Sequence, residues 1–133
     1  MNDTLLLVGR VLVALVFLMT VSLGSPSAGY LGSLGFPAPA IAHWVAVIAE
    51  ALIVLSVFFG IETRWGALLG MLYVVIATAF AHRYWQSPPA QFSAQYTNFS
   101  KNLAILGGLV LIYATGAGAY SVDGMRAGKP KAA

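Results

Sequence analysis

Four long runs of apolar residues, separated by short polar stretches, dominate the pattern along the chain. A helix needs about 20 largely apolar residues to cross the hydrocarbon core of a bilayer. Strands of a membrane β-barrel would instead alternate apolar and polar side chains over about 10 residues, and runs such as LLLVGRVLVALVFLM do not alternate. The pattern therefore predicts an all-α, four-helix transmembrane bundle that forms a single domain. Its expected spans are Thr4–Gly24, Ala40–Gly60, Arg64–His82 and Asn102–Gly118.

The residues between these runs indicate where helices begin and end. The link GIETR between the second and third spans is short, and Thr63 suits the N-cap of the helix that follows it. The link RYWQSPPAQFSAQYTNFS is long and rich in aromatic residues. We expect it to be a loop that ends at Ser100, as the N-cap of the fourth span. The polar tail, 119–133, is expected to be flexible.

Composition supports a membrane protein. Hydrophobic residues make up 59% of the 133 positions and charged residues only 8%, against about 25% charged in ordinary soluble domains. Because so few charges cannot cover a water-exposed surface, the lipid bilayer is the expected surrounding. The absence of cysteine excludes thiol nucleophiles, disulfides and thiolate metal sites. A net charge of +3 without a basic run before the tail does not indicate nucleic-acid binding.

The distribution of basic residues predicts the orientation. Loops on the cytoplasmic side of membrane proteins carry an excess of Lys and Arg. If both termini are cytoplasmic, that side holds Arg64, Arg126, Lys129 and Lys131, and the far side holds Arg83 and Lys101. We therefore expect a multi-pass protein of the inner or plasma membrane with both termini in the cytoplasm.

Two charged residues lie inside the predicted spans, Arg10 and Glu50. A charge at the bilayer centre costs about 2.5–3.5 kcal/mol on insertion scales. At a rise of about 1.5 Å per residue, Arg10 lies about 9 Å and Glu50 about 15 Å from the cytoplasmic ends of their spans. The simplest prediction is an Arg10–Glu50 ion pair facing the bundle interior, with either a structural or a proton-linked role. A protonated Glu50 is the alternative, because a neutral acid is cheaper to bury than a carboxylate.

A second polar group is expected toward the far side of the membrane. It comprises residues at the ends of the second, third and fourth spans: His43, His82, Lys101 and Asn102. Glu50 follows His43 by seven residues, so the two share a helix face about 10 Å apart. These side chains could bind the head group of a quinone. Haem ligation by His43 and His82 is less favoured because both lie at helix ends, and no third ligand is near enough in sequence for a metal site.

The last predicted span carries a more specific pattern. The stretch KNLAILGGLVLIYATGAGAYSVD resembles the C-terminal signature of the DoxX family of small four-helix membrane proteins. The matching positions are Lys101, Asn102, Gly107, Gly108, Gly116, Gly118, Ser121 and Asp123. Upstream, an Arg in the first span, a Pro before the second, a Glu within it and a Thr-Arg opening the third also resemble that family. They are Arg10, Pro37, Glu50, Thr63 and Arg64.

The resemblance implies a quinone-associated subunit of a membrane redox system. DoxX takes its name from a subunit associated with a terminal quinol oxidase and a thiosulfate:quinone oxidoreductase. Such a role requires a redox-enzyme partner subunit, and it leaves open whether the chain is itself an enzyme. The alternatives are a non-catalytic membrane scaffold or assembly factor, and a small-molecule or proton carrier. A carrier would need a homo-oligomer to provide alternating access, because the chain shows no inverted halves.

Overall fold

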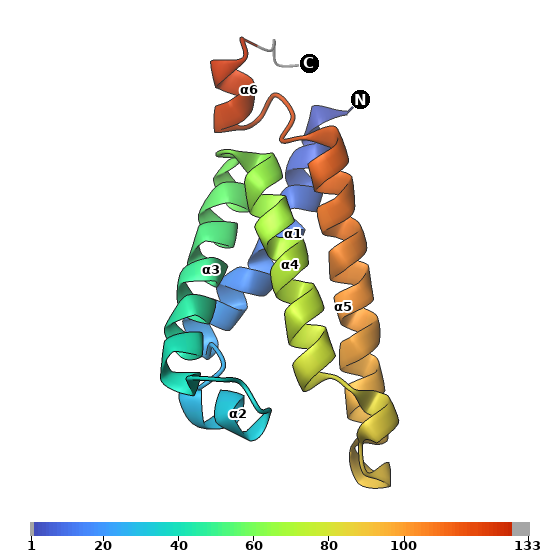
Figure 1. The fold of residues 1–133 in the computed structure, drawn as a ribbon. Helices are drawn as coiled ribbons and strands as arrows, with labels where there is room; N and C mark the ends of the chain where they lie inside the picture. Colours follow the sequence, from blue (N-terminus) through green and yellow to red (C-terminus); the bar gives the residue numbers. More distant parts are fainter. Residues whose placement is uncertain (1, 129–133) are drawn as a thin grey trace.

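A computed structural model describes residues 2–128 and confirms the all-α fold class. The described residues form four long helices and three short helical segments, and Figure 1 shows how the helices are arranged. The long helices are α1 (Asp3–Leu23), α3 (Pro39–Phe59), α4 (Thr63–Ala81) and α5 (Pro89–Thr115). The short ones are α2 (Ala28–Ser33), the 3-10 helix η1 (Tyr84–Gln86) and α6 (Val122–Arg126).

The long helices form a bundle in which α4 packs between α3 and α5, while α1 packs mainly against α3 and to a lesser extent against α5. Both ends of the described chain, the α3–α4 turn and α6 lie at one end of the bundle, called here the termini end (Figure 1). The α2 segment and η1 lie at the opposite end, called here the α2 end (Figure 1). In this view α1 runs obliquely behind α4, from beside α5 at the termini end toward α3 at the α2 end.

Three helical segments are long and apolar enough to cross a membrane: α1, α3 and the stretch Thr63–Gln86 that contains α4. The N-terminal part of α5, before Asn102, is more polar, but its remaining length is apolar and packs along α4. Large apolar side chains on the outer faces of all four helices are exposed, including Leu12, Ile48, Leu72 and Leu111. Such side chains are stable against lipid, whereas the backbone groups are satisfied within each helix.

The buried core is narrow because small residues bring the helices close together. At Gly66 an added Cβ would lie 1.9 Å from Ser56 Oγ, and at Gly70 it would lie 3.0 Å from a methyl group of Leu109. These two glycines, one turn apart on α4, allow α3 and α5 to approach closely, as small residues commonly do in membrane helices. The side chains of Ile53 and Leu109 fill the core beside them and are fully buried.

The fourth long helix begins well before the predicted span, which was expected to start at Asn102. Ser100 is therefore not an N-cap: it lies inside α5, where its hydroxyl donates to the Tyr96 carbonyl oxygen at 2.9 Å. The helix begins instead at Pro89, because proline suits the first helical position, where no N–H partner is needed. The aromatic residues of the expected loop form edge-to-face contacts around Tyr84, with Trp85, Phe92, Tyr96 and Phe99.

The sequence predicts a flexible tail from residue 119, and the described part of that tail, 119–128, contains buried residues and a short helix. Ala119 and Ser121 are buried, and α6 follows them. The Ser121 side chain caps α6 by accepting a hydrogen bond from the Gly124 N–H at 2.8 Å. Contacts with the α1 and α3–α4 segments hold this part of the chain in place, and they are described below. The end of the predicted tail, 129–133, lies outside the described residues.

Candidate functional site

A pocket of about 890 Å³ occupies the α2 half of the bundle. Helices α1, α3 and α4 form its walls, the segment from Gly24 to Pro37 covers one side, and Asn102 and Ile105 reach it from α5. Its lining is mainly apolar and includes Phe17, Leu31, Val45, Ala77 and Phe80. The ring of Phe36, after α2, packs against that of Phe80 with centroids 4.3 Å apart, which joins the α2 segment to α4.

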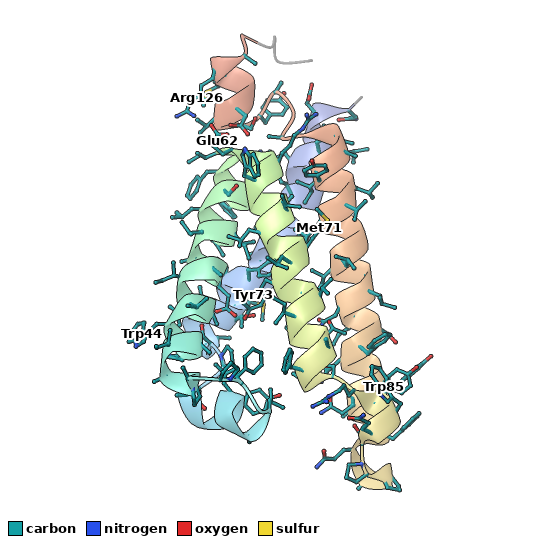
Figure 2. All side chains as sticks on the ribbon, viewed as in Figure 1. Trp44, Glu62, Met71, Tyr73, Trp85 and Arg126 are labelled. Carbon is teal, nitrogen blue, oxygen red and sulfur yellow. The ribbon has the colours of Figure 1, made fainter. Side chains whose placement is uncertain are left out.

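Glu50 is fully buried beside this pocket, and two hydroxyl groups satisfy its carboxylate. The Ser25 hydroxyl donates to Oε2, and the Tyr73 hydroxyl donates to Oε1. Tyr73 lies on the side of α4 that faces α1 and α3, and its ring makes an edge contact with Phe17 (Figure 2). Ser25 and Tyr73 both line the pocket, so their hydrogen bonds to Glu50 connect the pocket wall to helix α3.

The predicted Arg10–Glu50 ion pair is not formed in the described structure. Arg10 is 1% exposed, but its Nη2 donates to the Tyr120 carbonyl oxygen at 2.8 Å, at the termini end. Its Nε and Nη1 have no hydrogen-bond partner within residues 2–128, and Asp123 supplies the electrostatic attraction. The physical reason is that a long Arg side chain directs its charge toward the nearer membrane surface. Glu50 lies deeper, where hydroxyl groups can satisfy its oxygens.

The four predicted ligand-binding residues separate into two pairs. His82 and Asn102 line the pocket, whereas His43 and Lys101 are not part of its lining. The His43 ring nitrogen Nδ1 is 2.9 Å from the Pro26 carbonyl oxygen, a contact that holds the α1–α2 link against α3. Lys101 is exposed on α5. The structure therefore places two of the four residues around a common cavity.

The two pocket-lining residues of this group each have a partner on a neighbouring helix. His82 Nδ1 lies 2.9 Å from Gln95 Oε1, so the contact joins the end of α4 to α5. Asn102 Nδ2 donates to Thr78 Oγ1 at 2.9 Å, also between α5 and α4. Thr78 itself donates to the Val74 carbonyl oxygen within α4. These bonds orient both side chains beside the pocket.

Ser25 and Tyr73 are the members of the site that the sequence did not reveal. Ser25 lies in a link of small residues, where a serine is ordinary. Tyr73 carried a usable signal, because it lies near the middle of the third apolar run, whereas tyrosines of membrane helices are enriched at the interfaces. A hydroxyl so far from water requires a buried acceptor, and Glu50 is that acceptor.

A second polar cluster holds the termini end together. The Asp123 carboxylate accepts hydrogen bonds from the backbone N–H of Glu62 and Thr63 at 2.9 and 2.8 Å, and from the Thr63 hydroxyl at 2.7 Å. The Asp123 N–H in turn donates to the Gly60 carbonyl oxygen at 2.8 Å. At α1, Asp3 accepts a hydrogen bond from the Ala119 N–H at 2.9 Å. The segment 119–123, which includes the start of α6, is thereby attached to α1 and to the turn between α3 and α4.

The charge state of Asp123 follows from these contacts. Burial raises the pKa of its carboxyl, but the hydrogen bonds from Thr63 and Glu62 and the positive charge of Arg126 outweigh burial and lower the pKa below its ordinary value. Arg126 also lies 3.9 Å from a Glu62 carboxylate oxygen, in an exposed pair at the bundle surface (Figure 2). Asp123 is thus held as a carboxylate at neutral pH.

The described residues bring no three His, Asp or Glu side chains together in an arrangement that could hold a metal ion. The pocket instead offers a large apolar volume with a few hydroxyl, amide and imidazole groups. Pockets of about 300–1,000 Å³ with this character bind drug-sized organic molecules. The geometry therefore suits a mainly apolar ligand that carries a hydrogen-bonding head group.

Comparison with known proteins identifies the family. The chain matches the SURF4 family over residues 1–128. It is 32% identical over 129 residues to Inner membrane protein YphA of Escherichia coli (strain K12), a match that covers 92% of this chain and 90% of that protein. No solved structure matches the chain significantly.

These matches overturn the resemblance to DoxX. The residues that suggested it have structural roles that any similar bundle needs: Ser121 caps α6, Asp123 binds the α3–α4 turn, and Gly118 adopts a positive φ of 75° close to Asp3. Small and capping residues at the end of a helix do not distinguish one family from another. The protein is a multi-pass inner membrane protein, and the chain belongs to the SURF4 family.

Proposed function

We propose that this protein binds a mainly apolar small molecule with a hydrogen-bonding head group in the pocket between α1, α3 and α4. The observation that carries the proposal is the pocket itself: about 890 Å³, mainly apolar, and bordered by a buried carboxylate. A scaffold that only holds partner proteins requires no cavity of this size. Because helices of a bundle otherwise pack closely, an open recess of this size beside a buried carboxyl group supports a bound molecule.

A quinone ring is the first ligand class to test. It combines a flat ring and an apolar tail with two polar oxygens, which matches a lining in which polar groups are few. Ser25 and Tyr73 lie on one part of the lining, and His82 and Asn102 on another. In this proposal the chain holds the quinone as a subunit of a membrane redox system, and a partner subunit exchanges electrons with it.

The test is the quinone content of the protein after mild extraction from its own membranes, measured by liquid chromatography and mass spectrometry. The variant Ala77→Phe places a ring in the pocket. Its matched control, Ala79→Phe, makes the same change on the exposed face of the same helix, outside the pocket lining. We expect quinone in the wild type and in Ala79→Phe, and at least a tenfold lower content in Ala77→Phe.

Two results would contradict the proposal. The first is a wild-type protein that carries no quinone and binds none when quinone is added to it in lipid nanodiscs. The second is equal quinone content in the two phenylalanine variants, which would place the molecule in the surrounding lipid. An empty wild-type protein that purifies with a protein partner would instead support a scaffold.

A further inference from the structure

The hydroxyl groups beside Glu50 can still accept hydrogen bonds from a ligand in the pocket, but they have no hydrogen left to donate. A serine or tyrosine hydroxyl has one hydrogen to donate, together with lone pairs that accept. Ser25 and Tyr73 both use that hydrogen on Glu50. Each hydroxyl can therefore offer only lone pairs to a molecule in the pocket. Both carboxyl oxygens of Glu50 accept from these hydroxyls, and Glu50 has no ion-pair partner among the described residues.

Two more polar side chains of the lining can act as hydrogen-bond acceptors. The Thr20 hydroxyl donates to the Val16 carbonyl oxygen at 2.9 Å and leaves only lone pairs free. The His82 Nδ1 lies 2.9 Å from Gln95 Oε1, and in the tautomer that donates from Nδ1 to this oxygen the ring has an acceptor at Nε2. Asn102 keeps one N–H and its carbonyl oxygen, so it can act in either direction.

The other hydroxyl residues of the pocket lining, Ser27 and Tyr30, lie at the rim of the pocket. Ser27 and Tyr30 are exposed residues of the α2 segment, and Tyr30 is 44% exposed. Their hydroxyls can exchange hydrogen bonds with water or lipid head groups. Among the side chains of the described residues, the inner polar lining consequently has several acceptors, and Asn102 retains an N–H that can donate.

We infer that the pocket selects a ligand whose head group donates hydrogen bonds, such as a quinol, over the corresponding quinone, whose oxygens only accept. This inference rests on the proposed function, because it concerns the ligand of the same pocket. A quinol hydroxyl can donate to the lone pairs of Ser25 or Tyr73. A quinone oxygen at that place would face only the lone pairs of these hydroxyls, and burying polar groups without partners is costly.

The experiment compares three probes with one short-tailed ring, under anaerobic conditions, on the full chain in nanodiscs. The probes are the quinone, the quinol, and the quinol with both hydroxyls methylated, which cannot donate and does not undergo the same oxidation. Equilibrium dialysis gives a dissociation constant for each. One additional hydrogen bond is worth about a tenfold change in affinity. We expect the quinol to bind about tenfold or more tightly than the other two probes.

The variant Glu50→Gln tests the cause of that preference. Its side-chain amide is similar in shape but can donate to one of the two hydroxyls, which frees that hydroxyl's hydrogen for a ligand. We therefore expect the ratio of quinone to quinol dissociation constants to fall at least fivefold. Ala79→Phe, outside the lining, should keep the wild-type ratio.

The outcomes separate the two ideas. Wild-type protein that binds the quinone or the methylated probe as tightly as the quinol would overturn the donor preference while leaving the proposed pocket in place. Folded wild-type protein that binds none of the three would overturn both. If Glu50→Gln fails to fold, the comparison of the three probes on the wild type decides the question alone. An unchanged ratio in a folded Glu50→Gln protein would overturn the assignment to the Glu50 hydroxyl network.

Discussion

Helix α4 begins without a cap of its own, and Asp123 supplies one from a distant part of the chain. The residue at the N-cap position, Glu62, makes no side-chain capping bond and has a positive φ of 49°. The first backbone N–H groups of a helix have no partners within it. Two of these donors at α4, those of Glu62 and Thr63, bind the Asp123 carboxylate. Removing this carboxylate should therefore weaken the helix start and the attachment of α6 together.

The size of the effect of Asp123→Ala can be estimated from these contacts. Loss of an N-cap side chain costs about 1–2 kcal/mol. Thr63 is 1% exposed, so its N–H and hydroxyl would lose a partner in a buried place, which adds about 1–3 kcal/mol. The two effects overlap because they share the Thr63 N–H. We expect Asp123→Ala to lower the free energy of unfolding by about 2–4 kcal/mol.

The assay is reversible unfolding in mixed micelles, followed by circular dichroism as the fraction of denaturing detergent increases. Arg126→Ala is the matched control, because it removes an exposed charge from the same short helix. Its partner Glu62 is 3.9 Å away, and exposed pairs contribute little, so a change below about 0.5 kcal/mol is expected. Two results would refute the capping argument. The first is an Asp123→Ala protein whose free energy of unfolding is within about 0.5 kcal/mol of the wild-type value, which is the usual range for surface substitutions. The second is an Asp123→Ala protein that is no less stable than Arg126→Ala.

The same contact predicts a pH dependence with a defined sign. Because folding lowers the pKa of Asp123 below its ordinary value of 3.8, the folded state binds this proton less readily than the unfolded state. The contribution of Asp123 is then complete above that ordinary value and is lost as the pH falls through the lower, folded-state pKa. Asp123→Asn should lose this part of the acid sensitivity, and an unchanged acid profile in that variant would contradict the assignment.

Two further substitutions test the termini end and the separation of the buried charges. Gly60→Ala should destabilise the protein by about 2 kcal/mol or more, because the new Cβ would lie 2.0 Å from Arg10 Nη1 at a residue with φ of 69°. Gly107→Ala is the control: its new Cβ would have no atom within 4 Å, so the unfolding midpoint should not fall. Equal losses of stability in the two variants would refute the argument. In a double-mutant cycle, the stability changes caused by Arg10→Met and Glu50→Gln should add within about 0.5 kcal/mol, because the two residues have separate partners. A larger coupling energy would support the ion pair that the sequence predicts.

The helical part of the fold could be predicted from the sequence because the membrane makes the pattern simple. In lipid, only helices and closed β-barrels satisfy the backbone, and the apolar runs do not alternate as barrel strands do. The helices α1, α3 and α4 therefore lie where their apolar runs are, within a residue at each end. The start of α5 could not be found in this way. Its N-terminal part lies beyond the apolar run, where helix formation depends on local propensity, on the Pro89 start and on aromatic packing around Tyr84.

The candidate site was only partly predictable, for a different reason. Glu50 was conspicuous because burying its charge is costly, but charge alone suggested Arg10 as the partner. Hydroxyl groups satisfied Glu50 instead, and hydroxyl residues are too common in a sequence to be identified without the tertiary arrangement. The link that carries Ser25 reaches Glu50 only because the chain after α1 folds back along α3, as the contact between His43 and Pro26 shows.

The buried polar groups at the two ends of the bundle differ in what they bind, and this difference supports the pocket as the proposed ligand site. At the termini end, Arg10, Asp3 and Asp123 bind mainly backbone groups, so their contacts fix where the chain runs. Among residues 2–128, Glu50 binds the side-chain hydroxyls of Ser25 and Tyr73 and no backbone group, and both hydroxyl residues line the pocket. A buried carboxyl group needed only for packing could be replaced at little cost, provided that apolar side chains of similar volume also replaced its two hydroxyl partners. Its position beside a large pocket is therefore better explained by the hydrogen-bonding character that it gives to that pocket.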